Sequence, residues 1–323
     1  MTAPITAPYA TVPDYILGCT REIWEGRGVG AGLARYYAPD CLVRAPTGLT
    51  TSMAGVAADT LATLHQFPDR QLVGEDVVWK DLGGGDFLSS HRLISVMHHS
   101  GDGRWGPASG RLVKSRIIAD CWVTGGVITK EWLVRDGAAF AYALGHKPHA
   151  LAARLHAEDT AAGRPPAVFR PADDVPSRYR PRLADDPAAA LVAQAYRAIW
   201  GERSLTAIRS HYHAGCAVTV PGGSVRNGHD DFDRFVVGYL ASLPDARLTI
   251  HDAAVLREAE APARVALRWS LDGTHSGWGT FGAPTGKPLH LMGITHAQVT
   301  GGRIVAEWLL VDEVAVWTQI IAA

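Results

Sequence analysis

Apolar positions along the chain recur with two spacings, one typical of helices and one typical of strands. Near the start, Tyr15, Cys19 and Ile23 are four residues apart, which predicts a helix from Pro13 to about Arg27. Further helices are predicted at 30–37 and 55–67. Strands are predicted where glycine-rich turns separate the apolar runs, at 71–80, 86–98, 111–123 and 127–135. The first half of the chain therefore contains helices followed by a run of strands.

The same order of residues returns in the second half of the chain. Trp24 pairs with Trp200, and Asp136 with Asp312, each at an offset of 176 residues (200 − 24 and 312 − 136). The same offset relates further pairs of unlike type: Tyr36 and Tyr212, Pro68-Asp69 and Pro244-Asp245, His99 and His275, and Glu131-Trp132 and Glu307-Trp308. An offset shared by so many residue types is hard to obtain by chance. The sequence therefore predicts a tandem duplication.

The segment between the repeats is rich in proline and charge. Residues 164–187 contain six prolines, which favours a semi-rigid linker. An alanine-rich helix is predicted before it, at 150–162. We therefore expect a first domain at 1–150, a helix and linker at 151–186, and a second domain at 187–323.

The composition is typical of a soluble globular protein. Apolar residues make up 47% of the 323 residues, and the net charge of -1 does not favour a nucleic-acid or acidic-membrane partner. No apolar run approaches the roughly 20 residues needed to span a bilayer, and the start of the chain lacks the pattern of a secretory signal. The four cysteines form no CxxC pair. We therefore expect a cytoplasmic protein without a membrane or nucleic-acid partner.

The strands near the C-terminus carry the sharpest set of candidate catalytic residues. Alternation along these strands places two sets of residues on one face each: His290, Met292, Ile294 and His296, then Trp308, Leu310 and Asp312. If both faces point into the domain, they form an apolar pocket wall with two imidazoles and one carboxylate. Burial would raise the pKa of Asp312 and suit it to act as a general base. Alternatively, Asp312 caps the helix that follows, and the histidines are structural.

Short motifs in this region resemble those of a known family. They are Gly273-Thr274-His275-Ser276-Gly277, Pro284-Thr285-Gly286-Lys287, and Gly302-Arg303-Ile304-Val305 followed by Glu307-Trp308. In this order they resemble the SnoaL-like polyketide cyclase branch of the NTF2-like superfamily. The resemblance implies an α+β fold for each half, in which a curved antiparallel sheet wraps around helices and forms a cone with an internal pocket. The two domains are then expected to pack as an intrachain pseudo-dimer, and further homo-oligomerisation is left open.

The resemblance also implies chemistry without a cofactor or a metal. Cyclases of this family close rings by intramolecular aldol reactions with acid–base residues. The leading hypothesis is therefore a cyclase, isomerase or lyase that acts on a small, largely apolar carbonyl compound. Asp312 would be the base, and His290 or His296 would stabilise the oxyanion. The alternative is a non-catalytic module that binds a small molecule or supports assembly, because members without chemistry share the fold.

Further residues are expected around the pockets. For the second repeat, the expected substrate-binding residues are His275, Trp278, Phe281, Met292 and Trp308. The first repeat departs from the motif pattern, and its candidate set is more charged: His91, His99, Lys114, Arg116, Asp120 and Asp136. The charged set would bind an anionic substrate or form an internal salt-bridge network. If the strand register slips by one, Lys114 and Arg116 would point into a domain interface instead. The second repeat is therefore expected to carry the chemistry.

Overall fold

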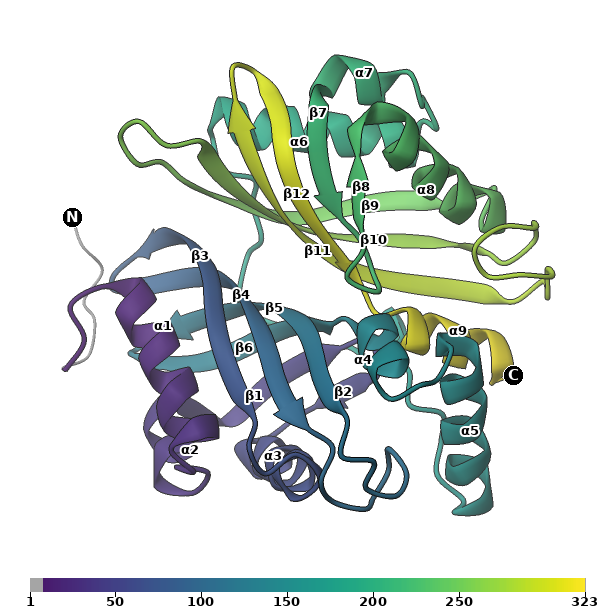
Figure 1. The fold of residues 1–323 in the computed structure, drawn as a ribbon. Coiled ribbons are helices and arrows are strands. Elements are labelled where there is room, and N and C mark those ends of the chain that lie inside the picture. Colours follow the sequence, from purple (N-terminus) through teal and green to yellow (C-terminus); the bar gives the residue numbers. More distant parts are fainter. Residues whose placement is uncertain (1–7, 323) are drawn as a thin grey trace.

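A computed structural model describes residues 8–322, and in it the two halves of the chain form two domains (Figure 1). The first domain contains α1 (Val12–Thr20), the π-helical segment η1 (Arg21–Glu25), α2 (Ala31–Tyr36), β1 (Tyr37–Ala45), β2 (Gly48–Thr50), α3 (Met53–Gln66), β3 (Gln71–Gly83), β4 (Asp86–His98), β5 (Leu112–Thr124), β6 (Val127–Arg135) and α4 (Gly137–Ala143). Helix α5 (Pro148–Ala161) and a short 3-10 turn, η2 (Pro171–Asp173), follow. The second domain contains α6 (Pro187–Tyr196), the π-helical segment η3 (Arg197–Gly201), α7 (Ala207–His211), β7 (Tyr212–Thr219), β8 (Val225–Asn227), α8 (Gly228–Ser242), β9 (Arg247–Leu256), β10 (Ala263–Thr274), β11 (Pro288–Thr300), β12 (Arg303–Val311) and α9 (Glu313–Ile321).

Each domain contains a six-stranded sheet with the same strand order. The orders are β2-β1-β6-β5-β4-β3 and β8-β7-β12-β11-β10-β9. Neighbouring strands are antiparallel except for β1 with β6 and β7 with β12, which are parallel. The sheets are therefore mixed rather than purely antiparallel. Their matching orders agree with the α+β fold expected for both halves and are consistent with a tandem duplication.

The strand pairing corrects one of the residue pairs that the constant offset of 176 predicted. Tyr37 of β1 pairs with Ile128, and Tyr212 of β7 pairs with Ile304. Tyr212 is therefore the counterpart of Tyr37 and not of Tyr36, as the constant offset predicted. The reason is that the segment between the π-helical turn and the first strand is one residue shorter in the second repeat.

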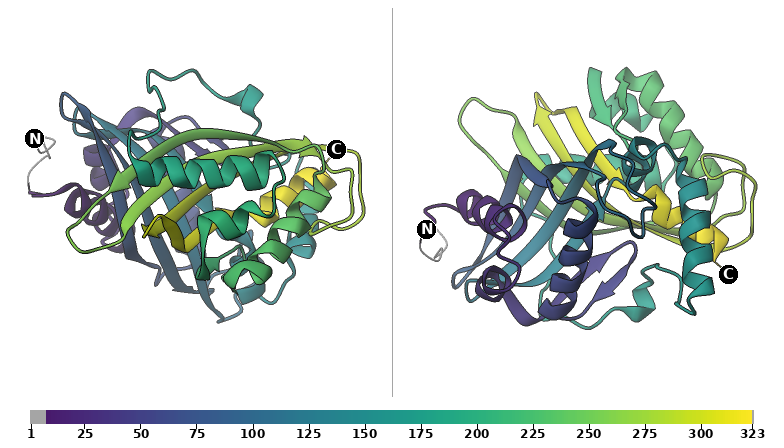
Figure 2. Two further views of the ribbon diagram at one scale, coloured as in Figure 1. Left: turned by 90° about the horizontal axis from the view of Figure 1, so that it is seen from above. Right: turned by 60° about the horizontal axis from the view of Figure 1, so that its bottom comes forward.

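The two sheets face each other, and the helices lie mainly on their outer sides (Figures 1 and 2). Helices α1, α2 and α3 belong to the outer side of the first sheet, and α6, α7 and α8 to that of the second. The facing surfaces share a buried apolar cluster made of Leu88, Ile118, Trp132, Val134, Met292, Ile294 and Leu310, together with Phe169 and Tyr179 of the linker. The central strands are therefore buried on both faces, and apolar alternation cannot distinguish the two faces.

The linker crosses the molecule with two aromatic side chains inserted between the domains. Its only regular structure is the 3-10 turn η2. Phe169 is 6% exposed and Tyr179 is 5% exposed, and the Tyr179 hydroxyl donates a hydrogen bond to Asp252 of β9. The second domain then begins at Pro187, where Asp186 caps α6 by accepting a hydrogen bond from the Ala188 N–H at 2.7 Å.

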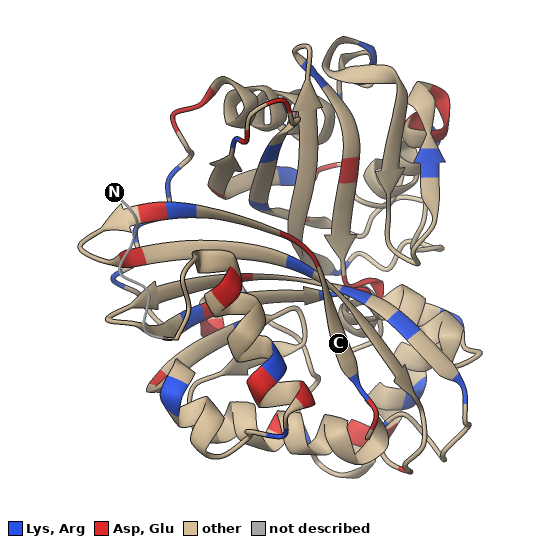
Figure 3. Ribbon diagram, turned by 60° about the vertical axis from the view of Figure 1, so that its left-hand side comes forward, with Lys and Arg blue, Asp and Glu red and all other residues tan. Residues whose placement is uncertain are grey.

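Helix α5 provides a further connection between the domains. Its Leu151 and Leu155 share a buried cluster with Val314 of α9, so the helix that follows the first domain covers the last helix of the second. Acidic and basic positions are interspersed over both domains (Figure 3), in line with the small net charge. No helix in residues 8–322 has the length and apolar character that a membrane crossing requires.

We expect the domains to remain associated after the linker is cut, because the interface between them is apolar and buried. A protease site inserted at the exposed residues Ala172 and Asp173 should be cleaved, and the nicked protein should elute as one species in size-exclusion chromatography. The same sample in denaturant should separate into two fragments, which controls for complete cleavage. Two peaks under native conditions would contradict a tight pseudo-dimer.

Candidate active site

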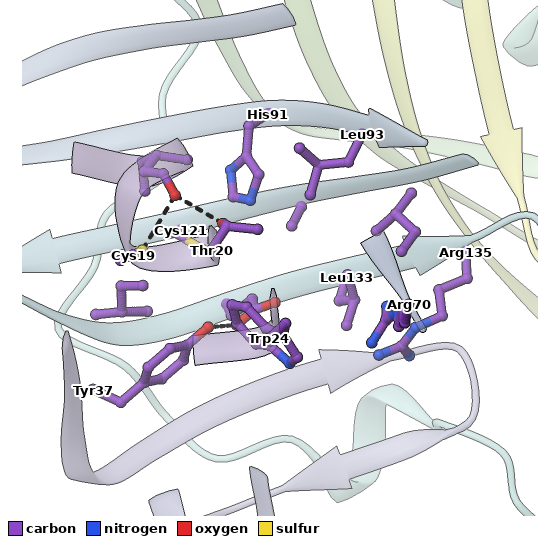
Figure 4. Close-up of a pocket in the computed structure, with 15 residues that line it drawn as sticks. Cys19, Thr20, Trp24, Tyr37, Arg70, His91, Leu93, Cys121, Leu133 and Arg135 are labelled. Carbon is purple, nitrogen blue, oxygen red and sulfur yellow. Dashed lines mark hydrogen bonds between the residues drawn. The ribbon is translucent and has the colours of Figure 1, made fainter. Parts of the chain in front are cut away.

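A cavity of about 50 Å³ lies in the first domain, between its sheet and the helical segment α1–η1 (Figure 4). Its lining comes from β4, β5 and β6, from the helical segment, from the start of β1 and from the loop before β3: Ile16, Cys19, Thr20, Trp24, Tyr37, Arg70, His91, Leu93, Ile117, Ala119, Cys121, Ile128, Glu131, Leu133 and Arg135. Glu131, Leu133 and Arg135 of β6 are two residues apart, as expected for one face of a strand, and the strand is irregular between them and Ile128. This face is therefore the inside of the cone.

Glu131 is the carboxylate of this cavity. The Tyr37 hydroxyl donates a hydrogen bond to its Oε2 at 2.8 Å, and no described residue donates to its Oε1. Thr20, the nearby hydroxyl on α1, donates instead to the Ile16 carbonyl at 2.7 Å. Burial raises the pKa of Glu131 above its ordinary value. Glu131 therefore has one oxygen held in place and one free to accept a proton.

His91 lines the same cavity as a neutral imidazole. It is buried, and burial lowers its pKa to about 3, with a smaller contribution from His296. Its Nδ1 has no hydrogen-bond partner among the described residues. An imidazole with so low a pKa stays uncharged near neutral pH. It can donate or accept a hydrogen bond, but it is a weak base.

Arg70 and Arg135 place two guanidinium groups side by side in the cavity (Figure 4). Arg70 is 8% exposed, its Nε donates to the Ser95 hydroxyl at 3.1 Å, and burial lowers its pKa to about 9. Burial also lowers the pKa of Arg135, which is densely surrounded by protein yet accessible to solvent. Arg135 therefore lies where the cavity meets solvent, at the end of β6.

The corresponding space in the second domain is filled. At three of the lining positions, the repeat offset places a larger side chain in the second domain: Thr20 becomes Tyr196, Leu93 becomes Trp269 and Ala119 becomes Thr295. The hydroxyls of Tyr196 and Tyr212 donate to the two carboxylate oxygens of Glu307 at 2.5 and 2.6 Å. Burial raises the pKa of Glu307 to about 7. The carboxylate that matches Glu131 is therefore fully buried, and both of its oxygens accept hydrogen bonds.

The sequence of the second domain matches a known family model. Residues 190–320 match the model of the SnoaL-like polyketide cyclases. The second domain is SnoaL-like. The first domain lies outside the matched residues and has the same strand order. A search of curated protein sequences gives no match.

Solved structures similar to this chain include proteins described as polyketide cyclases and one described as a hydroxylase. IdmH from Streptomyces antibioticus is 22% identical, with 41% of this chain and 97% of IdmH covered and a TM-score of 0.36. A SnoaL-like polyketide cyclase from Jannaschia sp. CCS1 is 17% identical, with 46% and 99% covered and a TM-score of 0.38. AclR from Streptomyces galilaeus, described as a hydroxylase, is 21% identical, with 42% and 84% covered and a TM-score of 0.35.

Asp312 of the SnoaL-like domain caps helix α9. Its carboxylate accepts hydrogen bonds from the Val314 and Ala315 N–H groups at 3.0 and 3.2 Å, and burial raises its pKa to about 6. It also lies against Gly137 of the first domain, where a Cβ would come within 2.1 Å of Oδ1. This is the geometry of a helix cap, which the sequence predicted as the alternative. Asp312 lies at the domain junction, away from the cone.

The predicted inward face of β11 is the interface face, so that expectation is wrong. His296 Nε2 is 2.9 Å from the Ser90 hydroxyl of the other sheet, while His290 Nδ1 is 2.7 Å from Asp272. Trp308 packs under the guanidinium of Arg92 at 3.7 Å. Because both faces of these strands are buried, an error of one residue exchanges interior and interface without breaking the apolar pattern. No described contact joins Asp312 to either histidine.

The other residues expected around the second pocket are dispersed. His275 holds a turn, with Nδ1 3.1 Å from the Thr285 hydroxyl, and His99 repeats this contact with Ser109 at 3.1 Å. Trp278 is 73% exposed, whereas Phe281 belongs to the buried core of the second domain. Met292 lies in the interface cluster. The expectation that these residues form one pocket wall is therefore also wrong.

Of the first-domain candidates, only His91 lines the cavity. Lys114 is exposed, and Arg116 pairs with Glu75 of its own domain at 2.8 Å, so neither cation lines the cavity and neither makes an ion pair across the domain interface among the described residues. Asp120 pairs with Arg268 of the other domain at 3.1 Å. Asp136 caps α4, accepting from the Ala139 N–H at 2.9 Å, and bonds the Gly222 N–H at the same distance.

Sequence reasoning missed the residues that the cavity brings together. Glu131 was visible only as one member of a repeated Glu-Trp pair. Arg70 and Arg135 occupy positions where the second repeat has Ala246 and Val311. The available signal was an inward position at which one repeat has a charged residue and the other an apolar residue. This signal can be recognised only once the inward face of the strand is known.

A second, larger cavity of about 390 Å³ lies between the domains under the linker. Its lining combines aromatic, basic and linker residues: Arg44, Trp132, Phe169, Pro171, Asp174, Val175, Pro176, Ser177, Tyr179, Pro181, His251, Arg268, Ser270, His290 and Met292. The predicted residues His290 and Met292 therefore line a cavity, but one outside both cones. Residues 8–322 contain no group of three or more His, Cys, Asp or Glu side chains arranged for a metal ion.

We expect Gly293→Ala to destabilise the SnoaL-like domain. A Cβ at this position would come within 2.3 Å of the Trp269 ring, which fills the cone. Overpacking of this kind costs about 1–3 kcal/mol in the free energy of unfolding. Denaturant unfolding would measure it, with Gly30→Ala as the control, since a Cβ there meets nothing within 4 Å. If the clash is the cause, Trp269→Leu should remove the effect in a double-mutant cycle; an equal cost in both backgrounds would contradict it.

Proposed function

We propose that the protein is an acid–base enzyme that removes a proton next to a carbonyl group in a small molecule, and that the site is the first-domain cavity. The observation that carries the proposal is Glu131, a buried carboxylate that lines a cavity, with a raised pKa and one oxygen that accepts no hydrogen bond from residues 8–322. The match of the second domain to the SnoaL-like polyketide cyclases supports chemistry of this class.

The proposed step needs a base and a cation. Glu131 takes the proton from the carbon next to the carbonyl, the C–H electron pair forms the carbon–carbon double bond of an enolate, and the carbonyl oxygen gains the negative charge. The guanidinium groups of Arg70 and Arg135 stabilise this charge, and the buried Arg70 contributes most, because electrostatic stabilisation is strong where water is excluded. Aldol cyclisation, isomerisation and elimination all begin with this step. The step draws its proton acceptor and its charge stabilisation from side chains of this chain.

A second candidate function is ligand binding without chemistry. The observation that favours it is the larger cavity between the domains, which includes Trp132, Tyr179 and His290. Such a module would hold a compound unchanged. The identity of a compound that copurifies with the protein, and its fate during incubation, would distinguish binding from turnover.

We expect Glu131→Gln to lower the rate by roughly 100-fold or more, as for a lost general base. The assay is hydrogen–deuterium exchange next to the carbonyl of small ketones and 2-oxo acids, followed by proton NMR. The wild-type rate should rise with pH as Glu131 ionises. Glu307→Gln is the matched control and should keep the rate, because both oxygens of Glu307 already accept tyrosine hydrogen bonds. Equal losses in both variants, or no exchange above the buffer rate with any compound, would contradict the proposal.

We expect Thr20→Tyr to inactivate the site without unfolding the domain. The new hydroxyl would take the position of Tyr196, cap the free oxygen of Glu131 and occupy the cavity. The second domain shows that the fold accepts tyrosine here. Exchange should fall to the buffer rate while the melting temperature is kept or raised, and Thr20→Ser should remain active. A fully active Thr20→Tyr variant would place the chemistry elsewhere.

A further inference from the structure

Two arginines face the first-domain cavity without a carboxylate partner. Among residues 8–322, neither Arg70 nor Arg135 forms an ion pair, and their only side-chain hydrogen bond is from Arg70 to Ser95. Glu131 is bonded by Tyr37. The carboxylates of Glu131, Asp312 and Asp59 act on Arg135 in that order of strength, but none of them is close enough to form an ion pair with it, so Glu131 offsets at most one of the two positive charges. The cavity therefore has an excess of positive charge.

This arrangement is costly for the protein alone. Burying the Arg70 guanidinium without a counter-charge is unfavourable, and the guanidinium of Arg135, although accessible to solvent, repels it. The repulsion contributes to the lowered pKa of Arg70. An anion between the two groups would remove both costs, because guanidinium groups bind carboxylates through paired, charge-assisted hydrogen bonds.

The second domain shows that the fold does not need these arginines. It has Ala246 at the position of Arg70 and Val311 at the position of Arg135, in a sheet of the same strand order. Val311 is buried in the continuous core of that domain. A structural requirement common to the fold therefore does not explain the arginines, whereas a bound anion does.

We propose that Arg70 and Arg135 form a carboxylate-binding subsite, so that the substrate is a small carbonyl compound that carries a carboxylate. The reaction rests on the proposed function, but the binding of the anion does not. The cavity volume of about 50 Å³ limits the size of the ligand. A single water needs roughly 10–15 Å³ measured in this way, so the space suits a short acid of about half a dozen non-hydrogen atoms. A short 2-oxo acid would place its carboxylate and carbonyl oxygens on the same pair of guanidinium groups.

The test compares pyruvate with 2,3-butanedione, in which a methyl group replaces the carboxylate oxygen, by calorimetry and ligand-observed NMR on the full chain. Pyruvate should bind at least tenfold more tightly than the diketone. Arg70→Ala and Arg135→Val, which install the residues of the second domain, should each weaken pyruvate binding about 10- to 100-fold, as for the loss of a charged hydrogen bond. Binding of the diketone should not change. Arg135→Lys should retain part of the affinity for pyruvate.

Two further measurements separate the possible failures. The melting temperature of Arg70→Ala should be kept or raised, since the variant removes a buried guanidinium without an ion pair, and that of Arg135→Val should be kept, since Arg135 is accessible to solvent. A marked fall in either would assign that arginine a structural role and overturn the subsite. Inorganic phosphate should bind more weakly than pyruvate, and the reverse order would overturn the choice of a carboxylate. Glu131→Gln should bind pyruvate at least as tightly as the wild type. Binding without exchange in the wild type would sink the proposed reaction and leave the subsite standing.

Discussion

The packing of the two sheets against each other is the constraint on which the rest of the structure depends. Each sheet has one face toward its own helices and one face toward the other domain, so its central strands are largely buried on both faces. The interface face contains ion pairs such as Arg268 with Asp120, whereas the cone face contains Glu131 or Glu307. A residue on a central strand therefore serves either the association of the domains or the interior of a cone. Two residues that are adjacent along one strand therefore have different roles, one in the interface and one in the cone.

This constraint explains what could be predicted from the sequence and what could not. The bounds of β4 and β6 match the predicted strands, and the repeat was visible because it depends on identity and spacing alone. The assignment of faces was not available, because a strand buried on both sides lacks the polar alternation that marks a solvent face. His290 and His296 were consequently placed inside the cone, although they lie on the interface side. The capping role of Asp312 was foreseen only as an alternative, since an acidic residue before a helix has the same sequence pattern in either role.

A comparison of the two domains explains the role of the cavity, because the same fold has a different interior in each domain. In the second domain a continuous apolar core surrounds Glu307, and both of its oxygens accept tyrosine hydrogen bonds. In the first domain the apolar residues form several smaller clusters, and the cavity lies among them. Filling the interior adds buried apolar contacts and so stabilises a domain. A domain that keeps a cavity lined by a carboxylate and two arginines forgoes that stabilisation, which is the usual relation between stability and a functional site.

The difference between the interiors depends on coupled residues rather than on one substitution. Trp269 fits into the second cone because Gly293 leaves the space beside it, while the matching positions in the first domain are Leu93 and Ile117. A tryptophan at position 93 alone would meet the Ile117 side chain, and a glycine at position 117 alone would enlarge the cavity. Either single change costs stability, through overpacking or through lost contacts. The open and the filled interior are therefore two separately consistent packings of one fold, and single substitutions between them pass through a less stable protein.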